Sequence, residues 1–226
     1  MPRESGEVAA QSRKNLIAAA SRLFRRQGTH VSLSAVTAEV GLTNGGFYRH
    51  FASKEALLEE ATEQAFNDLR DRLAGFASSH EGDHEAARAA LIEYYLSSPH
   101  RDDLTAGCPA SGLAADASRG QLGENTRAHY LGGVRDLVAW IMGTPGETPS
   151  GSPLALTSAS GADSDAAAYG VPDELSGEAM ATLSTMAGAL MLSRATTGSP
   201  LSEQFLSAAR KTLLHSKPHP TARLGG

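Results

Sequence analysis

The stretch at residues 31–58, VSLSAVTAEVGLTNGGFYRHFASKEALL, constrains the fold of this chain more than any other segment. Ser32 and Thr43 are suited to begin short helices, because their hydroxyl groups can accept hydrogen bonds from free N–H groups at a helix start. Gly41 lies between them and provides the backbone freedom that a tight turn needs. Two short helices separated by a glycine turn indicate a helix-turn-helix, whose second helix enters the major groove of DNA.

Most of the remaining chain shows helical periodicity, and no alternating run is long enough for a strand. The apolar spacing and the candidate caps predict helices over about residues 8–27, 53–78 and 174–197, with others after Asp83, after Cys108 and Pro109, through Tyr130 to Ile141, and after Ser199 and Pro200. We therefore expect an all-α fold.

Residues 143–172 interrupt this pattern and are rich in Gly, Ser, Pro and Ala. A segment so poor in large apolar side chains cannot bury enough surface to offset the entropy of ordering it, so we expect a flexible loop. A functional Ω-loop is the alternative. The tail at residues 217–226 is expected to be mobile as well.

Charge is distributed unevenly along the chain. The net charge is -5 over 226 residues, yet residues 1–54 hold eight Lys/Arg against three Asp/Glu and carry +5, which leaves -10 on the rest. A basic N-terminal module on an acidic body is suited to phosphate contact at one end. With no apolar run of about eighteen residues, no signal-peptide core and a single cysteine, we expect a cytoplasmic protein without a membrane span or an internal disulfide.

An aromatic and basic run follows the second short helix. Its residues are Phe47, Tyr48, Arg49, His50 and Phe51, followed by Ser53, Lys54, Glu55, Ala56 and Leu57. Together with the helix that ends near Gly28, this run resembles the DNA-binding domain of the TetR family of one-component bacterial transcription regulators over residues 12–60. The resemblance implies a helix-turn-helix domain of three helices at residues 8–52 and a helical ligand-binding and dimerisation domain at residues 53–216.

The resemblance also implies which residues contact double-stranded DNA. They are Ser32, Thr43, Asn44, Gly45, Tyr48, Arg49, His50 and Lys54. Tyr48 and Lys54 match positions that hold phosphates, and the Asn44 amide is suited to read an adenine edge. Arg49 is as well explained by a solvated charge as by a phosphate contact, whereas Phe47 and Phe51 are expected in the core.

Adjacent glycines in the recognition helix depart from the family pattern. Gly45 and Gly46 each cost roughly 1 kcal/mol relative to alanine in a helix interior. Close approach of the backbone to DNA is one explanation for them, and a helix that becomes ordered only on binding is the other.

A pocket for a small apolar effector is expected within the helical body, again by resemblance. Its candidate lining residues are Tyr94, Tyr95, Cys108, Tyr130, Trp140 and Met191. Cys108 precedes a predicted short helix, where free amides and the helix dipole would lower the pKa of its thiol and make it a sensor of oxidants or electrophiles. The alternative is a buried, inert cysteine.

A palindromic operator requires a homodimer with its two recognition helices about 34 Å apart. The last two predicted helices are the expected interface, because the family pairs them into a four-helix bundle. The candidate interface residues are Leu183, Met186, Ala187, Leu190 and Phe205. The same apolar stripe is also what a helix buried within one subunit would show.

The sequence therefore predicts a ligand-responsive regulator, and a repressor in particular, that needs no cofactor and no metal and is not an enzyme. The acidic and histidine residues between His80 and His84 are better explained as a solvated loop than as a metal site. The rival interpretation is a helical carrier or enzyme that has kept this fold without DNA binding. The basic N-terminus with Tyr48 and Lys54 argues against that rival.

Overall fold

The computed structural model describes residues 6–143 and 177–215, and all regular structure within these ranges is helical. The helices are α1 (Gly6–Gln27), α2 (Leu33–Glu39), α3 (Asn44–Phe47), α4 (Lys54–Ser79), α5 (His84–Tyr95), α6 (Ser98–Asp102), α7 (Pro109–Gly112), α8 (Ala114–Ser118), α9 (Glu124–Met142), α11 (Gly177–Ala195) and α12 (Pro200–His215). The predicted all-α fold is confirmed. None of these helices combines the length and the apolar character needed to cross a membrane.

Side-chain caps determine where α2, α3, α4 and α5 begin, and Ser97 caps α6 in the same way. In each case the capping oxygen accepts from the backbone N–H three residues later, which would otherwise lack a partner. The first four caps are Ser32, Thr43, Ser53 and Asp83, with oxygen to nitrogen distances of 3.0–3.2 Å. All four helix starts were predicted from the sequence, and the structure confirms them.

The N-terminal helices share a core built on phenylalanines. Phe24, Phe47 and Phe51 are almost completely buried, and the rings of Phe47 and Phe51 stack with their centroids 5.6 Å apart. Leu16 from α1 and Leu57 from α4 also belong to this core. They join α2, α3 and the residues after them, which we call the recognition segment (residues 32–51), to the long helix α4 that leads into the body. The expectation that Phe47 and Phe51 lie in the core is confirmed.

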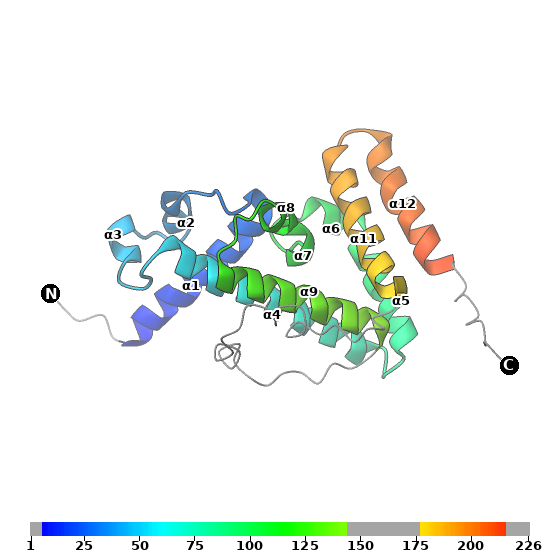
Figure 1. Cartoon of the computed structure of the whole chain (residues 1–226), viewed down its shortest axis with the longest axis horizontal. Helices are drawn as coiled ribbons and strands as arrows, with labels where there is room; N and C mark the ends of the chain where they lie inside the picture. The colour runs from blue at the N-terminus through cyan, green and yellow to red at the C-terminus, as the bar shows by residue number, and fades with distance from the viewer. Residues whose placement is uncertain (1–5, 144–176, 216–226) are drawn as a thin grey trace, which may run out of the picture.

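The body is arranged around α4 and α9, which run alongside each other (Figure 1). Their closest approach is at Gly133, because a side chain there would overlap the ring of Phe66. The hairpin of α11 and α12 packs against α5 and α9 and stands at the end of the molecule remote from α3 (Figure 1). This arrangement places the recognition segment and the terminal hairpin at opposite ends of one helical framework.

Two short helices, α6 and α8, were not predicted. Pro99 lies in the first turn of α6, where its missing N–H costs nothing. The predicted loop at residues 143–172 and the predicted tail at 217–226 lie outside the described residues, apart from Gly143. Gly143 ends α9 with a φ of 78°, a left-handed conformation that favours glycine.

Candidate nucleic-acid interface

Helix α3 presents a polar, exposed tip on an apolar base. Thr43, Asn44 and Arg49 are exposed, and the Tyr48 side chain is 62% exposed, whereas Phe47 between them is fully buried. The Thr37 hydroxyl of α2 lies 3.2 Å from Asn44 Oδ1 and holds that side chain against α2. The burial of Phe47 thus fixes α3 to the core while its neighbours point to solvent.

The glycine pair in α3 has no explanation within the chain. A Cβ at Gly45 would meet no atom closer than 3.9 Å, and one at Gly46 none closer than 3.6 Å. Neither glycine has a positive φ. Alanine would therefore fit both positions of the isolated molecule, and crowding within the fold does not account for the cost of two helical glycines.

The basic and aromatic residues of the recognition segment differ in how far their side chains are engaged by the rest of the fold. Within the described residues Arg49 makes no ion pair, and Tyr48 touches Phe47 edge to face with ring centroids 5.2 Å apart. His50 is half-buried at the end of the recognition segment, and Ser32 is occupied as the cap of α2. Tyr48 and Arg49 are thus the free long polar side chains next to the tip.

Lys54 is not a free phosphate contact in this structure. Its Nζ donates a 2.6 Å hydrogen bond to the carbonyl oxygen of Thr29 and lies 6.0 Å from the centroid of the Phe24 ring. The ammonium has two further protons available to other acceptors. Lys54 therefore ties the turn after α1 to the start of α4, a role that the sequence did not reveal.

The turn at Thr29 is also held by a side chain from the body of the molecule. The Asp116 carboxylate on α8 accepts a 2.9 Å hydrogen bond from the Thr29 N–H, and both residues are buried. Arg13 of α1 forms an ion pair with Glu60 of α4 and lies over the Phe51 ring at 4.7 Å. Sequence reasoning missed Asp116, because nothing in the local pattern of α8 marks a carboxylate that is buried by a distant turn.

Three of the six residues predicted to line the effector pocket lie together. Tyr95, Cys108 and Tyr130 gather around α7, where the Tyr95 hydroxyl donates to Ser111 Oγ at 3.3 Å and the Tyr130 hydroxyl donates to the Ala110 carbonyl at 2.8 Å. The other three residues lie elsewhere: Tyr94 beside Arg72, Trp140 beside His84, and Met191 on the surface, 47% exposed. Trp140 and Tyr130 both pack against the hydrophobic cluster that contains Tyr95 and Cys108, and a shared lining of the six residues stays a prediction.

Cys108 is a buried core residue with only 3% of its surface exposed. It precedes α7, but its side chain caps no helix N–H, and α7 has only four residues. Burial raises the pKa of the Cys108 thiol, and this outweighs the hydrogen bonds that lower it. The predicted lowering of that pKa was therefore wrong, because the chain covers the site from water.

Three of the predicted interface residues are part of the subunit's own core. Leu183, Met186 and Leu190 are 9%, 1% and 0% exposed, so they cannot make first contact with a second copy. Ala187 and Phe205 are half-buried. The opposite face of the hairpin carries exposed Met180, Met191, Leu192 and Leu201. An interface on these two helices stays a prediction, and the burial of Leu183, Met186 and Leu190 moves the surface available for it to the opposite face of α11, which is also apolar.

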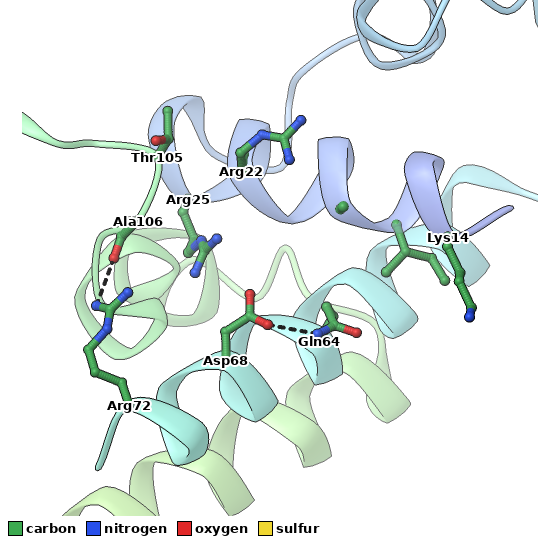
Figure 2. A pocket seen from close by; sticks show the side chains of 10 residues that line it. Lys14, Arg22, Arg25, Gln64, Asp68, Arg72, Thr105 and Ala106 are labelled. Atoms are coloured by element: carbon green, nitrogen blue, oxygen red, sulfur yellow. Dashed lines mark hydrogen bonds between the residues drawn. The ribbon is translucent and has the colours of Figure 1, made fainter. Parts of the chain in front are cut away.

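A basic cleft of about 520 Å³ opens between α1, α4 and the loop before α7 (Figure 2). Its lining residues are Lys14, Ile17, Ala18, Arg22, Arg25, Gln64, Asp68, Arg72, Thr105 and Ala106. None of the residues predicted for a pocket lines this cleft. The sequence signal that could have revealed it is the spacing of Lys14, Arg22 and Arg25 along one side of α1.

Comparisons with known proteins agree with this geometry. The family model described as "Bacterial regulatory proteins, tetR family" matches residues 16–61, which span the helix-turn-helix and the start of α4. No curated protein sequence gives a significant match to the chain.

Several solved structures share the fold over nearly the whole chain. The reduced form of NemR from E. coli is 21% identical, with 88% of this chain and 95% of NemR covered at a TM-score of 0.61. A TetR-family regulator from Agrobacterium tumefaciens is 18% identical over 90% of this chain and 97% of its own, at a TM-score of 0.66. A TetR regulator from Chloroflexus aurantiacus J-10-FL is 24% identical over 92% and 96%, at a TM-score of 0.63.

These likenesses establish the fold, and the family model identifies the segment that carries the recognition helix. Residues 16–61 of this chain thus match the model of the TetR family of bacterial regulatory proteins, and the chain shares the all-helical fold of the TetR-family structures above.

Proposed function

We propose that this protein is a homodimeric repressor that binds a palindromic operator through α2 and α3 and leaves it when an effector binds. The observation that carries the proposal is the tip of α3. Its polar residues are exposed around a fully buried Phe47, and within the described residues the side chains of Tyr48 and Arg49 make no hydrogen bond or ion pair. An exposed polar helix start on a rigid base is what major-groove reading requires.

Each exposed residue suits one kind of contact. The Tyr48 hydroxyl and the Arg49 guanidinium are assigned to phosphates, which set the register of the protein on DNA. Asn44 is assigned to base reading, because a side-chain amide can pair with an adenine edge at two points. Thr43 and His50 flank this contact at the two ends of the segment.

The glycine pair supports close approach to DNA. Alanine would fit at Gly45 and Gly46 within the chain, so the space above their backbone is free in the isolated molecule. A phosphate or base edge that fills this space would exclude a methyl group. Gly45→Ala should therefore keep the fold, gain helix stability and lose DNA affinity, a combination that a purely structural glycine would not show.

The exposed face of the terminal hairpin is the proposed dimer interface. Met180, Met191, Leu192 and Leu201 are 47–50% exposed, and Gly188 between them has open space above its backbone. Large exposed side chains around a small residue favour close packing of two helices. The hairpin lies at the opposite end from α3, so pairing there would leave both recognition helices free for DNA (Figure 1).

Salt-dependent DNA binding tests the proposal. Wild-type protein and the variants Tyr48→Phe and Arg49→Gln are titrated against a mixed-sequence duplex by fluorescence anisotropy at several salt concentrations. Each variant should bind more weakly, and Arg49→Gln, which removes a cation, should also reduce the salt slope by about one. Lys211→Gln removes an exposed cation from α12, at the end of the molecule opposite α3, and serves as the control that should bind like wild type.

Two further results would decide between DNA binding and the carrier alternative. Selection from a randomised operator should show relaxed preference for Asn44→Ala, with discrimination reduced by roughly 1–3 kcal/mol. If the wild-type protein shows no salt-dependent affinity for any duplex, DNA binding is excluded and a carrier or enzyme role takes its place.

A further inference from the structure

The basic cleft between α1 and α4 combines an unusual number of cations with a single carboxylate. Lys14, Arg22 and Arg25 come from α1, Arg72 comes from α4, and only Asp68 opposes them, which leaves a net charge of +3. In Figure 2 the side chains of Arg22 and Arg25 project from α1, and that of Arg72 projects from α4 toward the Ala106 carbonyl at one edge of the cleft. Ile17 and Ala18 of α1 add an apolar patch to the wall.

These cations are largely unsatisfied by the protein. Arg25 Nε donates to the Ser21 carbonyl at 3.1 Å, and Arg72 Nη1 donates to the Ala106 carbonyl at 3.2 Å. Over residues 6–143 and 177–215, none of the four forms an ion pair, and Arg22 and Lys14 make no hydrogen bond through their side chains. Asp68 instead accepts from Gln64 Nε2 at 2.7 Å. Arg72 also lies over the Tyr94 ring, with its Cζ 5.3 Å from the ring centroid, so the available guanidinium donors are mainly those of Arg22 and Arg25.

Keeping these like charges close together costs the folded protein free energy. Burial lowers the pKa of Arg25, and the neighbouring positive charges of Arg72 and Arg22 lower it further against the opposing effect of Asp68. A partly buried guanidinium is normally paired with an anion, because removal from water costs free energy that an opposite charge offsets. Asp68 is the one carboxylate that lines the cleft, and within the described residues it forms no ion pair with Arg25.

We propose that the cleft binds a small organic anion, whose carboxylate or phosphate group is held by Arg22, Arg25 and Arg72 and whose carbon part lies on Ile17 and Ala18. Guanidinium groups suit this task, since their planar donors match the oxygens of both anions in pairs. A volume of about 520 Å³ accommodates a metabolite of ordinary size.

The position of the cleft gives the anion a regulatory consequence, which rests on the proposed function. The ligand would bridge α1, α4 and the loop at Thr105 and Ala106. Helix α6, which precedes that loop, is held from α11, where Arg194 donates to the carbonyl oxygens of Arg101 and His100 at 3.0 Å each. A bound anion therefore favours one placement of α1 relative to the terminal hairpin and shifts DNA affinity to the extent that it prefers that placement.

Direct binding of anions tests the site without DNA. Pyrophosphate and citrate are titrated separately into the full-length protein by isothermal calorimetry, with sodium chloride adjusted to constant ionic strength. We expect at least one to bind with a dissociation constant of about 1 mM or tighter. Binding by pyrophosphate alone assigns the phosphate class, and binding by citrate alone assigns the carboxylate class.

Variants locate the binding. Arg22→Gln and Arg25→Gln should each weaken it by about tenfold or more, since each removes charge-assisted hydrogen bonds. Arg26→Gln, an exposed arginine next to Arg25 that does not line the cleft, should bind like wild type. Arg22 is exposed, so its variant remains informative even if Arg25→Gln folds poorly. The proposal is overturned if neither anion binds, or if Arg26→Gln weakens binding as much as Arg22→Gln.

A second measurement separates the site from the proposed function. DNA affinity is measured with and without the saturating anion. A shift in wild type that Arg22→Gln abolishes supports the regulatory role, and an unchanged affinity overturns that role while the site stands. Protein that binds the anion but no duplex contradicts the proposed function and leaves the anion site intact. A loss of duplex affinity in Arg22→Gln with unchanged anion binding would assign the arginine to DNA and overturn the site.

Discussion

The buried carboxylate of Asp116 accepts a hydrogen bond from the backbone N–H of Thr29 at 2.9 Å, although 87 positions separate the two residues. Gly28, with a φ of 83°, precedes this contact, and a Cβ at Gly28 would lie 3.1 Å from the same carboxylate oxygen. The turn that leads into the recognition segment is thus fitted to a side chain of the body.

Removal of this carboxylate should loosen the turn. Asp116→Ala leaves the Thr29 N–H buried without an acceptor, so we expect the free energy of unfolding to fall by about 1–3 kcal/mol. Asp116→Asn keeps an oxygen that can accept from Thr29 and should cost less. Urea unfolding of the two variants measures the difference, and equal losses would show that the charge matters more than the hydrogen bond to Thr29.

Adjacent glycines in α9 should respond in opposite directions to alanine. Gly133→Ala places a methyl group into the ring of Phe66 and should destabilise the protein by about 1–3 kcal/mol. Gly132→Ala meets open space and should stabilise it by roughly 0.5–1 kcal/mol, because alanine loses less backbone entropy in a helix. Thermal unfolding of both variants provides the comparison. Similar behaviour would mean that α4 and α9 do not approach each other as described.

Stability should fall below neutral pH through His100. Its Nδ1–H donates to the Tyr95 carbonyl at 2.7 Å, and burial lowers the pKa of His100 below its ordinary 6.5, with Arg194 and Arg72 adding to this effect and Asp103 opposing it. The unfolded chain therefore takes up a proton at a higher pH than the folded protein. The stabilisation is complete above the unfolded pKa and declines as pH falls through 6.5 toward the folded pKa.

The corresponding measurement is urea unfolding at about pH 7.5 and about pH 5.5, on the two sides of the ordinary histidine range. His100→Asn retains a donor for the Tyr95 carbonyl but cannot titrate, so it should show a smaller loss of stability on acidification than wild type. His30→Gln, at an exposed histidine, should lose as much as wild type. A full acid loss in His100→Asn would assign the pH dependence to other groups.

Cys108 should react slowly in the native protein. Burial raises the pKa of its thiol and shields the sulfur, so both the thiolate fraction and its access to reagents are low. Labelling with a thiol-reactive disulfide should be slow when native, fast in urea, and accelerated by alkaline pH in both. Rapid labelling of the native protein at neutral pH, followed by release of DNA, would restore the sensor hypothesis that the buried environment argues against.

The exposed face of the terminal hairpin should control oligomeric state. Leu192→Glu introduces a charge on this face, so we expect a shift from dimer to monomer in light scattering, with the helical circular dichroism signal retained. Val8→Glu replaces a comparably exposed residue near the start of α1 and should leave the mass unchanged. A dimer that survives Leu192→Glu places the interface elsewhere.

Local chemistry made much of the fold predictable. The caps at Ser32, Thr43, Ser53 and Asp83 depend on residues three positions apart, and the structure confirms all four. The exposure of the polar residues of α3 also followed from the sequence, because Phe47 and Phe51 were expected in the core and are buried there.

Long-range features could not be predicted in this way. Which face of α11 turns inward depends on where α9 and α12 lie, and the sequence does not give this. For this reason the buried residues Leu183, Met186 and Leu190 were expected at the dimer interface. The bonds from Lys54 and Asp116 to the turn at Thr29 depend on how α4 and α8 are placed, and the basic cleft depends on α1 and α4 together. Such relationships have no signature in the spacing of any single helix.

The clamped turn at Thr29 bears on attempts to exchange recognition domains between regulators. Its N–H is held by Asp116 and its carbonyl oxygen by Lys54, so the peptide units on both sides of this residue have fixed partners outside the first two helices. A chimera joined at residue 53 would carry Thr29 into a foreign body that lacks this aspartate. The transferable unit is therefore discontinuous in the chain, and a working graft should include α8 along with the residues that read DNA.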